Sequence, residues 1–76
     1  MNYIVEPIFA NNFGGNCYHF NDWVQTYDCA VSLLEEEEGV VYVDISSSSG
    51  DYIRMYKKKG GGVGFKAPWE IPEDEV

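Results

Sequence analysis

The chain has 76 residues, of which 13 are Asp or Glu and five are Lys or Arg, so its formal net charge is −8 at pH 7. This length allows one small domain, and the negative charge excludes ordinary binding to a nucleic-acid backbone, which needs a basic surface. No run of about 18 apolar residues is present, so no membrane-spanning helix is expected.

Apolar residues make up 45% of the chain and aromatic residues 16%. Disordered acidic segments combine high charge with low hydrophobicity, whereas this composition supplies enough apolar side chains for a core. We therefore expect one folded domain over residues 1–71 and a disordered acidic tail over residues 72–76. No basic segment precedes an apolar stretch, so no secretory signal is expected, and the predicted location is the cytoplasm.

Three stretches of the chain alternate between apolar and polar residues and predict strands. Residues 3–9 form the first, although Pro7 has no N–H for a sheet ladder, which favours an edge or an interruption there. Residues 40–46 and 52–58 follow the same pattern around a polar turn and predict an antiparallel hairpin. After a glycine-rich turn, residues 63–67 could return as a further strand.

Residues 22–37 have the period of an amphipathic helix. Trp23, Tyr27, Ala30 or Val31, and Leu34 recur at three- and four-residue steps, and Asn21 and Asp22 are good N-cap residues. Several residues of the segment also favour strands, so a strand remains the alternative. The predicted fold class is α+β: a small antiparallel sheet of three or four strands with one helix on a face, in the order β-α-β-β-β.

Charge is distributed unevenly along the sequence. Residues 1–53 contain nine acids and no Lys or Arg, residues 54–66 contain all five bases, and residues 67–76 contain four acids. The acids of the first segment therefore have few partners within the chain. We expect the remaining negative charge to face solvent or another molecule.

Four consecutive glutamates, at positions 35–38, close the predicted helix, where the helix dipole is negative. Local stability would favour Lys or Arg there. The cluster therefore indicates either a solvated, frayed helix end or a surface that a basic partner requires. Carboxylates resemble phosphates in charge and accept paired hydrogen bonds from Arg.

Aromatic residues and further acids complete the predicted partner-binding set. Tyr52 and Tyr56 flank Arg54 on one strand face, which points outward if Ile53 and Met55 face the helix, and interfaces favour Tyr and Arg. Trp23 could serve as a further anchor. The set comprises Glu35, Glu36, Glu37, Glu38, Asp28, Asp44, Asp51, Trp23, Tyr52 and Tyr56.

The Cys and His residues are Cys17, His19 and Cys29. Their spacing does not match a structural zinc site, which takes four ligands from closely spaced pairs, so neither a metal nor a cofactor is expected. Cys17 and His19 could share a strand face as nucleophile and base, but a domain this small is not expected to add an orienting group, an oxyanion hole and a cleft. We therefore predict a protein that is not an enzyme, with Cys29 in the core.

The lysine and glycine run at positions 57–64 is similar to a phosphate-binding loop only in composition. In the P-loop the glycines precede the lysine and a helix follows, and neither holds here. A solvated hairpin tip is predicted, with a local anion contact as the alternative.

A small, acidic, aromatic-rich domain with a glutamate cluster and no catalytic motif resembles the counter-defence proteins of phages and mobile elements, which include anti-CRISPR and anti-restriction inhibitors. The resemblance covers composition and residues 35–38, and no family site is carried over. It implies a non-enzymatic inhibitor that docks an acidic face onto the basic nucleic-acid-binding groove of a partner protein, in the host cytoplasm if the chain is phage-encoded. The basic residues 54–66 limit such mimicry to one face.

Two other functions remain open from the sequence. The first is interaction through the sheet, with a partner or as a homodimer, by the strand edge near Pro7 or the tyrosine face. The second is an enzyme that uses Cys17 and His19. Docking through acids should weaken with salt, whereas docking through the sheet should be nearly insensitive to it.

Overall fold

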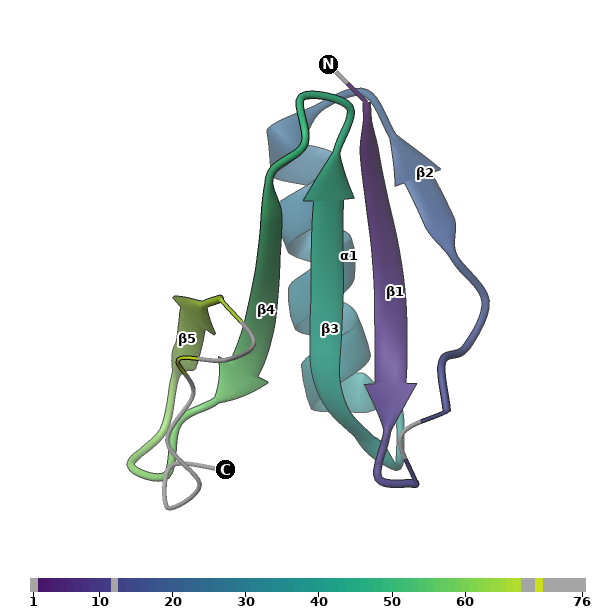
Figure 1. Cartoon of the computed structure of the whole chain (residues 1–76). Coiled ribbons are helices and arrows are strands. Elements are labelled where there is room, and N and C mark those ends of the chain that lie inside the picture. Colours follow the sequence, from purple (N-terminus) through teal and green to yellow (C-terminus); the bar gives the residue numbers. More distant parts are fainter. Residues whose placement is uncertain (1, 12, 68–69, 71–76) are drawn as a thin grey trace.

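The computed structural model describes residues 2–11, 13–67 and 70 and has an α+β fold (Figure 1). The five strands form one antiparallel sheet in the order β2-β1-β3-β4-β5, and α1 lies across one face of it. The elements are β1 (Tyr3–Phe9), β2 (Tyr18–Phe20), α1 (Trp23–Glu36), β3 (Val40–Ser47), β4 (Tyr52–Lys57) and β5 (Val63–Lys66). The predicted class is confirmed, and β2 is a strand that the prediction missed.

The sequence also led to predictions about membrane spans and about the limits of the domain. In the described part of the chain, no helix has both the length and the apolar character needed to cross a membrane. The predicted domain limit at residue 71 and the predicted tail at residues 72–76 lie outside the described residues.

Residues 23–36 form a helix and not the alternative strand. A carboxylate oxygen of Asp22 accepts a hydrogen bond from the backbone N–H of Gln25 at 3.2 Å, so Asp22, one of the two predicted cap residues, is the N-cap. The buried Thr26 hydroxyl donates to the Asp22 carbonyl at 2.8 Å, so this buried polar side chain has its partner. The first turn is thereby held by both the side chain and the backbone of one residue.

Pro7 is accommodated because its carbonyl group, and the nitrogen that lacks a hydrogen, are on the side of β1 that faces away from β3. β1 lies between β2 and β3, but β2 pairs only with residues 3–5 of β1. At Pro7 the carbonyl accepts a hydrogen bond from the N–H of Gly15 at 2.9 Å, so the missing N–H also lies on this side. The proline therefore interrupts no hydrogen bond between β1 and β3.

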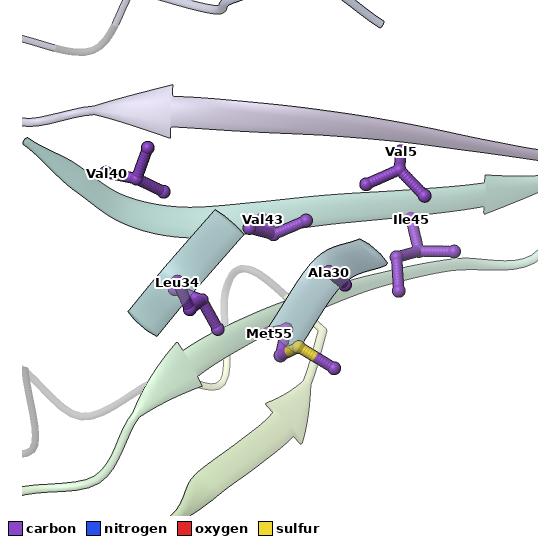
Figure 2. Close-up of a cluster of buried hydrophobic side chains, with 7 residues drawn as sticks. All are labelled: Val5, Ala30, Leu34, Val40, Val43, Ile45 and Met55. Atoms are coloured by element: carbon purple, nitrogen blue, oxygen red, sulfur yellow. The ribbon is translucent and has the colours of Figure 1, made fainter. Parts of the chain in front are cut away.

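The core lies between α1 and the three central strands (Figure 2). Thr26, Ala30 and Leu34 are the buried residues of the helix, and they follow its four-residue spacing. Alternate residues of the strands point toward them because strand side chains change face at every step. The buried apolar cluster consists of Val5, Ala30, Leu34, Val40, Val43, Ile45 and Met55.

The opposite face of the sheet carries no helix, yet it buries one large side chain. Tyr42, Tyr56 and Gly64 are aligned across β3, β4 and β5, and the Tyr56 side chain is only 1% exposed. A Cβ atom on Gly64 would lie 2.6 Å from the Cζ of Tyr56. Gly64 therefore gives the tyrosine ring the room to lie against β5.

We expect Gly64→Ala to destabilise the fold by about 1–3 kcal/mol, because the added methyl group overpacks against the buried Tyr56 ring. Gly60→Ala is the matched control: nothing lies within 4 Å of its added Cβ, and its backbone has no positive φ. We expect the control to change stability by less than about 0.5 kcal/mol. Urea unfolding of the two variants measures the difference, and equal stabilities would contradict this packing.

Candidate functional site

The outward side of α1 is acidic. Thr26, Ala30 and Leu34 face the sheet, so Asp28 and Glu35, which are seven residues apart, lie together on the opposite side of the helix. Both side chains are exposed, and the helix contains no Lys, Arg or His. The charged side chains of this side of the helix are therefore all carboxylates.

The glutamate cluster continues this surface past the end of the helix. The last helical residue is Glu36, and the N–H of Glu37 donates to the Leu33 carbonyl at 3.2 Å to close the final turn. All four glutamates are exposed. We name the exposed carboxylates Asp28, Glu35, Glu36, Glu37 and Glu38 the acidic helix surface.

Lysines lie near one edge of this surface without pairing to it. Glu35, Lys57 and Lys58 line one shallow cavity of about 260 Å³ between the end of α1 and the β4–β5 turn. Across the residues that the structure describes, the only ion pair joins Asp44 and Arg54. The charge of the acidic helix surface is therefore not neutralised by ion pairs within this part of the molecule.

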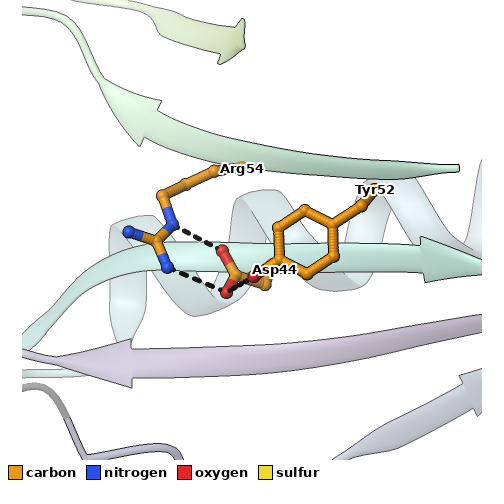
Figure 3. Close-up of polar contacts among 3 residues, drawn as sticks. All are labelled: Asp44, Tyr52 and Arg54. Atoms are coloured by element: carbon orange, nitrogen blue, oxygen red, sulfur yellow. Dashed lines mark hydrogen bonds and ion pairs between the residues drawn. The ribbon is translucent and has the colours of Figure 1, made fainter. Parts of the chain in front are cut away.

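Asp44 lies on the helix-free face of the sheet, at the centre of a polar cluster (Figure 3). The Arg54 Nε and Nη2 atoms donate to its two carboxylate oxygens at 2.7 Å and 3.0 Å, and the Tyr52 hydroxyl donates to the second oxygen. The Arg54 guanidinium also lies over the Tyr42 ring, 4.6 Å from its centre. Asp44 is buried, and each of its oxygens has a partner inside the chain.

Contacts with Asp44 favour the protonated forms of both Arg54 and Tyr52. Hydrogen bonding with Asp44 raises the pKa of the Arg54 guanidinium further above its usual range. Burial raises the pKa of the Tyr52 hydroxyl, and the hydrogen bond and charge of Asp44 raise it further. Arg54 therefore stays charged and Tyr52 stays protonated at physiological pH, which keeps β3 and β4 joined on this face.

The structure changes the accessibility of two predicted partner-binding residues. Asp44 is 6% exposed and Tyr56 is 1% exposed, so neither presents a side chain to a partner. For Asp44 the reason is its pairing with Arg54, and for Tyr56 it is the space above Gly64. The other eight residues of the predicted set are exposed: Glu35, Glu36, Glu37, Glu38, Asp28, Asp51, Trp23 and Tyr52.

The cysteines and the histidine are not gathered into a site with other ligands. Cys17 and His19 are exposed, and Cys17 precedes β2. Cys29 is half-buried and packs against the core, as predicted for its side of the helix, and burial raises the pKa of its thiol. Among the described residues, no three His, Cys, Asp or Glu side chains are close enough to hold a metal ion together.

Sequence reasoning missed the Asp44–Arg54 pair, although the sequence holds a signal for it. The β3–β4 turn places Ser46 opposite Tyr52 and therefore Asp44 opposite Arg54. Once a hairpin turn is placed, its length fixes the pairing of all residues along both strands. Arg54 is the single arginine of the chain. The acid opposite it in the hairpin is therefore the one best placed to accept paired hydrogen bonds from a guanidinium.

Comparison with protein-family models, with curated proteins and with solved structures finds no match for this chain. Its function is therefore inferred from the chemistry of its own residues.

We expect the Tyr52 phenol to titrate above its ordinary pKa of 10.0 in the folded protein. A raised pKa means that the protonated phenol stabilises the fold below pH 10, and that this contribution is lost as the pH rises through the folded pKa. NMR titration of Cζ-labelled tyrosine measures it, with Tyr52→Phe to assign the signal. In Asp44→Asn the Tyr52 pKa should fall toward 10.0, and an unchanged pKa would contradict the hydrogen bond.

Replacing the four glutamates at positions 35–38 by Gln should stabilise the fold, because carboxylates at a helix C-terminus oppose the dipole and repel one another. We expect a total gain of about 1 kcal/mol in urea unfolding at low salt, shrinking at high salt. The control neutralises the four acids at positions 70 and 73–75, which changes the net charge equally. An equal gain in both variants would assign the effect to net charge instead.

Proposed function

We propose that this protein is a non-enzymatic inhibitor that docks the acidic helix surface onto the basic nucleic-acid-binding groove of a partner protein. The observation that carries the proposal is that five exposed carboxylates lie on and beyond one helix, without an ion pair to any described base. The inhibitor class follows the resemblance in composition to anti-CRISPR and anti-restriction proteins. By occupying the groove, the carboxylates would exclude the phosphates that normally bind there.

The physical chemistry of the surface supports docking of this kind. Opposite charges steer two proteins together and raise the association rate, most strongly at low salt. Each carboxylate can accept two parallel hydrogen bonds from an arginine, as a phosphate can. The glutamates at positions 35–38 also lie at the helix end that local stability would reserve for bases, which agrees with a role in binding.

A second function, interaction through the helix-free face of the sheet, is favoured by one row of side chains. Glu6, Asp44, Arg54 and Lys66 are aligned across β1, β3, β4 and β5, so acids lie at one end of the row and bases at the other. A second copy placed in the reverse direction would bring Glu6 of each chain toward Lys66 of the other. Exposed Ile4 and Tyr52 flank this row and could pack in such a homodimer.

The experiment for the first function compares three proteins as bait in a lysate, at low and at high salt, with mass spectrometry of the captured proteins. The baits are the parent chain, the variant with Gln at positions 35–38, and the control with neutral residues at positions 70 and 73–75. We expect the parent and the control to capture nucleic-acid-binding proteins at low salt only. The Gln variant should capture them at least tenfold less, because about 1.4 kcal/mol of binding energy corresponds to a tenfold change in affinity.

Competition identifies the surface of the partner that is occupied. If the acidic helix surface takes the place of phosphates, a double-stranded oligonucleotide added to the lysate should release the captured protein. Equal capture by the parent and by the Gln variant would overturn the proposal. Capture that is insensitive to salt, together with a concentration-dependent dimer in sedimentation, would support the sheet-mediated function instead.

A further inference from the structure

A cavity of about 350 Å³ lies between the start of α1 and the β3–β4 turn. The apolar residues Ile45 and Ile53 and the aromatic residues Tyr3 and Trp23 are among those that line it. Asp51 is the one acid among its described lining residues, and no base lines it. The lining therefore combines apolar and aromatic residues with a single acid.

The aromatic rings and the carboxylate are held in place by their own contacts. The rings of Tyr3 and Trp23 are 5.5 Å apart at an interplanar angle of 59°. The Asp51 N–H donates to the Ser47 hydroxyl at 3.2 Å, the Asp51 carbonyl accepts from the Ser47 N–H at 3.0 Å, and the Ser49 hydroxyl donates to a carboxylate oxygen of Asp51 at 3.1 Å. Gly50, with a φ of 95°, gives the turn the left-handed conformation that it requires.

The molecule already contains one arginine in the same chemical setting. On the helix-free face, Arg54 lies over the Tyr42 ring and pairs with Asp44, which also accepts the Tyr52 hydroxyl. The cavity has the same groups, aromatic faces and a carboxylate, but no guanidinium from its described lining. Trp and Tyr faces attract cations, and a planar guanidinium both stacks on such rings and pairs with a carboxylate.

We propose that this cavity binds an arginine side chain of the partner protein. The inference rests on the proposed function, because it is the basic partner that supplies the arginine. The guanidinium would stack against Trp23 and Tyr3 and pair with Asp51, and the alkyl stem would lie on Ile45 and Ile53. The positive end of the α1 dipole lies beside Trp23 and would repel a cation. The carboxylate of Asp22, which caps the helix there, offsets this positive charge and so reduces the repulsion.

The test is an NMR titration of the full chain with three small ligands, followed through the indole N–H of Trp23 and the backbone N–H of Asp51. The ligands are N-acetyl-arginine methylamide, the lysine analogue, and the citrulline analogue, which is a neutral isostere of arginine. We expect the arginine ligand to shift both signals, the lysine ligand to shift them less, and the citrulline ligand to leave them unchanged. Equal shifts with citrulline would overturn the proposal, because the cavity would then select no charge.

Two single-charge variants assign the effect to the cavity. Asp51→Asn should weaken arginine binding about fivefold, the loss of one partly exposed ion pair. Glu70→Gln removes the same charge from an exposed residue outside both the cavity and the acidic helix surface, and should leave the affinity unchanged. Trp23→Leu, checked for native chemical shifts, should also weaken binding. Equal weakening by Asp51→Asn and Glu70→Gln would overturn the proposal in favour of general attraction to an acidic protein.

The same variants separate failure of this inference from failure of the proposed function. If Asp51→Asn captures the partner as well as the parent does while the Gln variant at positions 35–38 does not, the function stands and the arginine site is wrong. If the Gln variant captures the partner normally, the acidic docking is wrong, whatever the cavity binds.

Discussion

The charge pattern of the chain constrains everything else about this protein. Its first 53 residues carry nine acids and no Lys or Arg, and they include α1 and the first three strands. The pairing of β3 with β4 places the guanidinium of Arg54 beside one of these acids, Asp44, and the two form an ion pair. The domain thereby joins its central strands on the helix-free face, while the carboxylates of the helix, at the opposite surface, have no ion pair to a described base.

Most of the fold could be predicted because local patterns specify it. The three- and four-residue steps between apolar side chains and the Asp22 cap identify α1, and alternation identifies the longer strands. The sequence could not identify β2, which has three residues and pairs only with residues 3–5 of β1. A strand this short has no alternation to detect, and its conformation depends on the neighbour that it pairs with.

The candidate site was predictable in part, for an electrostatic reason. Exposure of the glutamates at positions 35–38 follows from their charge and from the absence of a base before Arg54. Burial of Asp44 and Tyr56 depends instead on cross-strand register and on the missing side chain of Gly64. The cavity proposed to bind arginine joins residues from β1, α1 and the β3–β4 turn, so no short stretch of the sequence contains it.

In the proposed function the acidic helix surface and the cavity would act over different distances, so a binding partner would have to meet two separate requirements. Glutamates at the end of α1 would attract a basic surface before contact, but at physiological ionic strength salt screens that attraction beyond about 8 Å. The cavity acts only on contact, where partial burial weakens the screening. Trp23 and Glu35 are twelve residues apart on one helix, or about 18 Å at 1.5 Å per residue. A basic groove that also offers an arginine at about this distance can satisfy both, so spacing as well as charge would distinguish the right partner from other basic proteins.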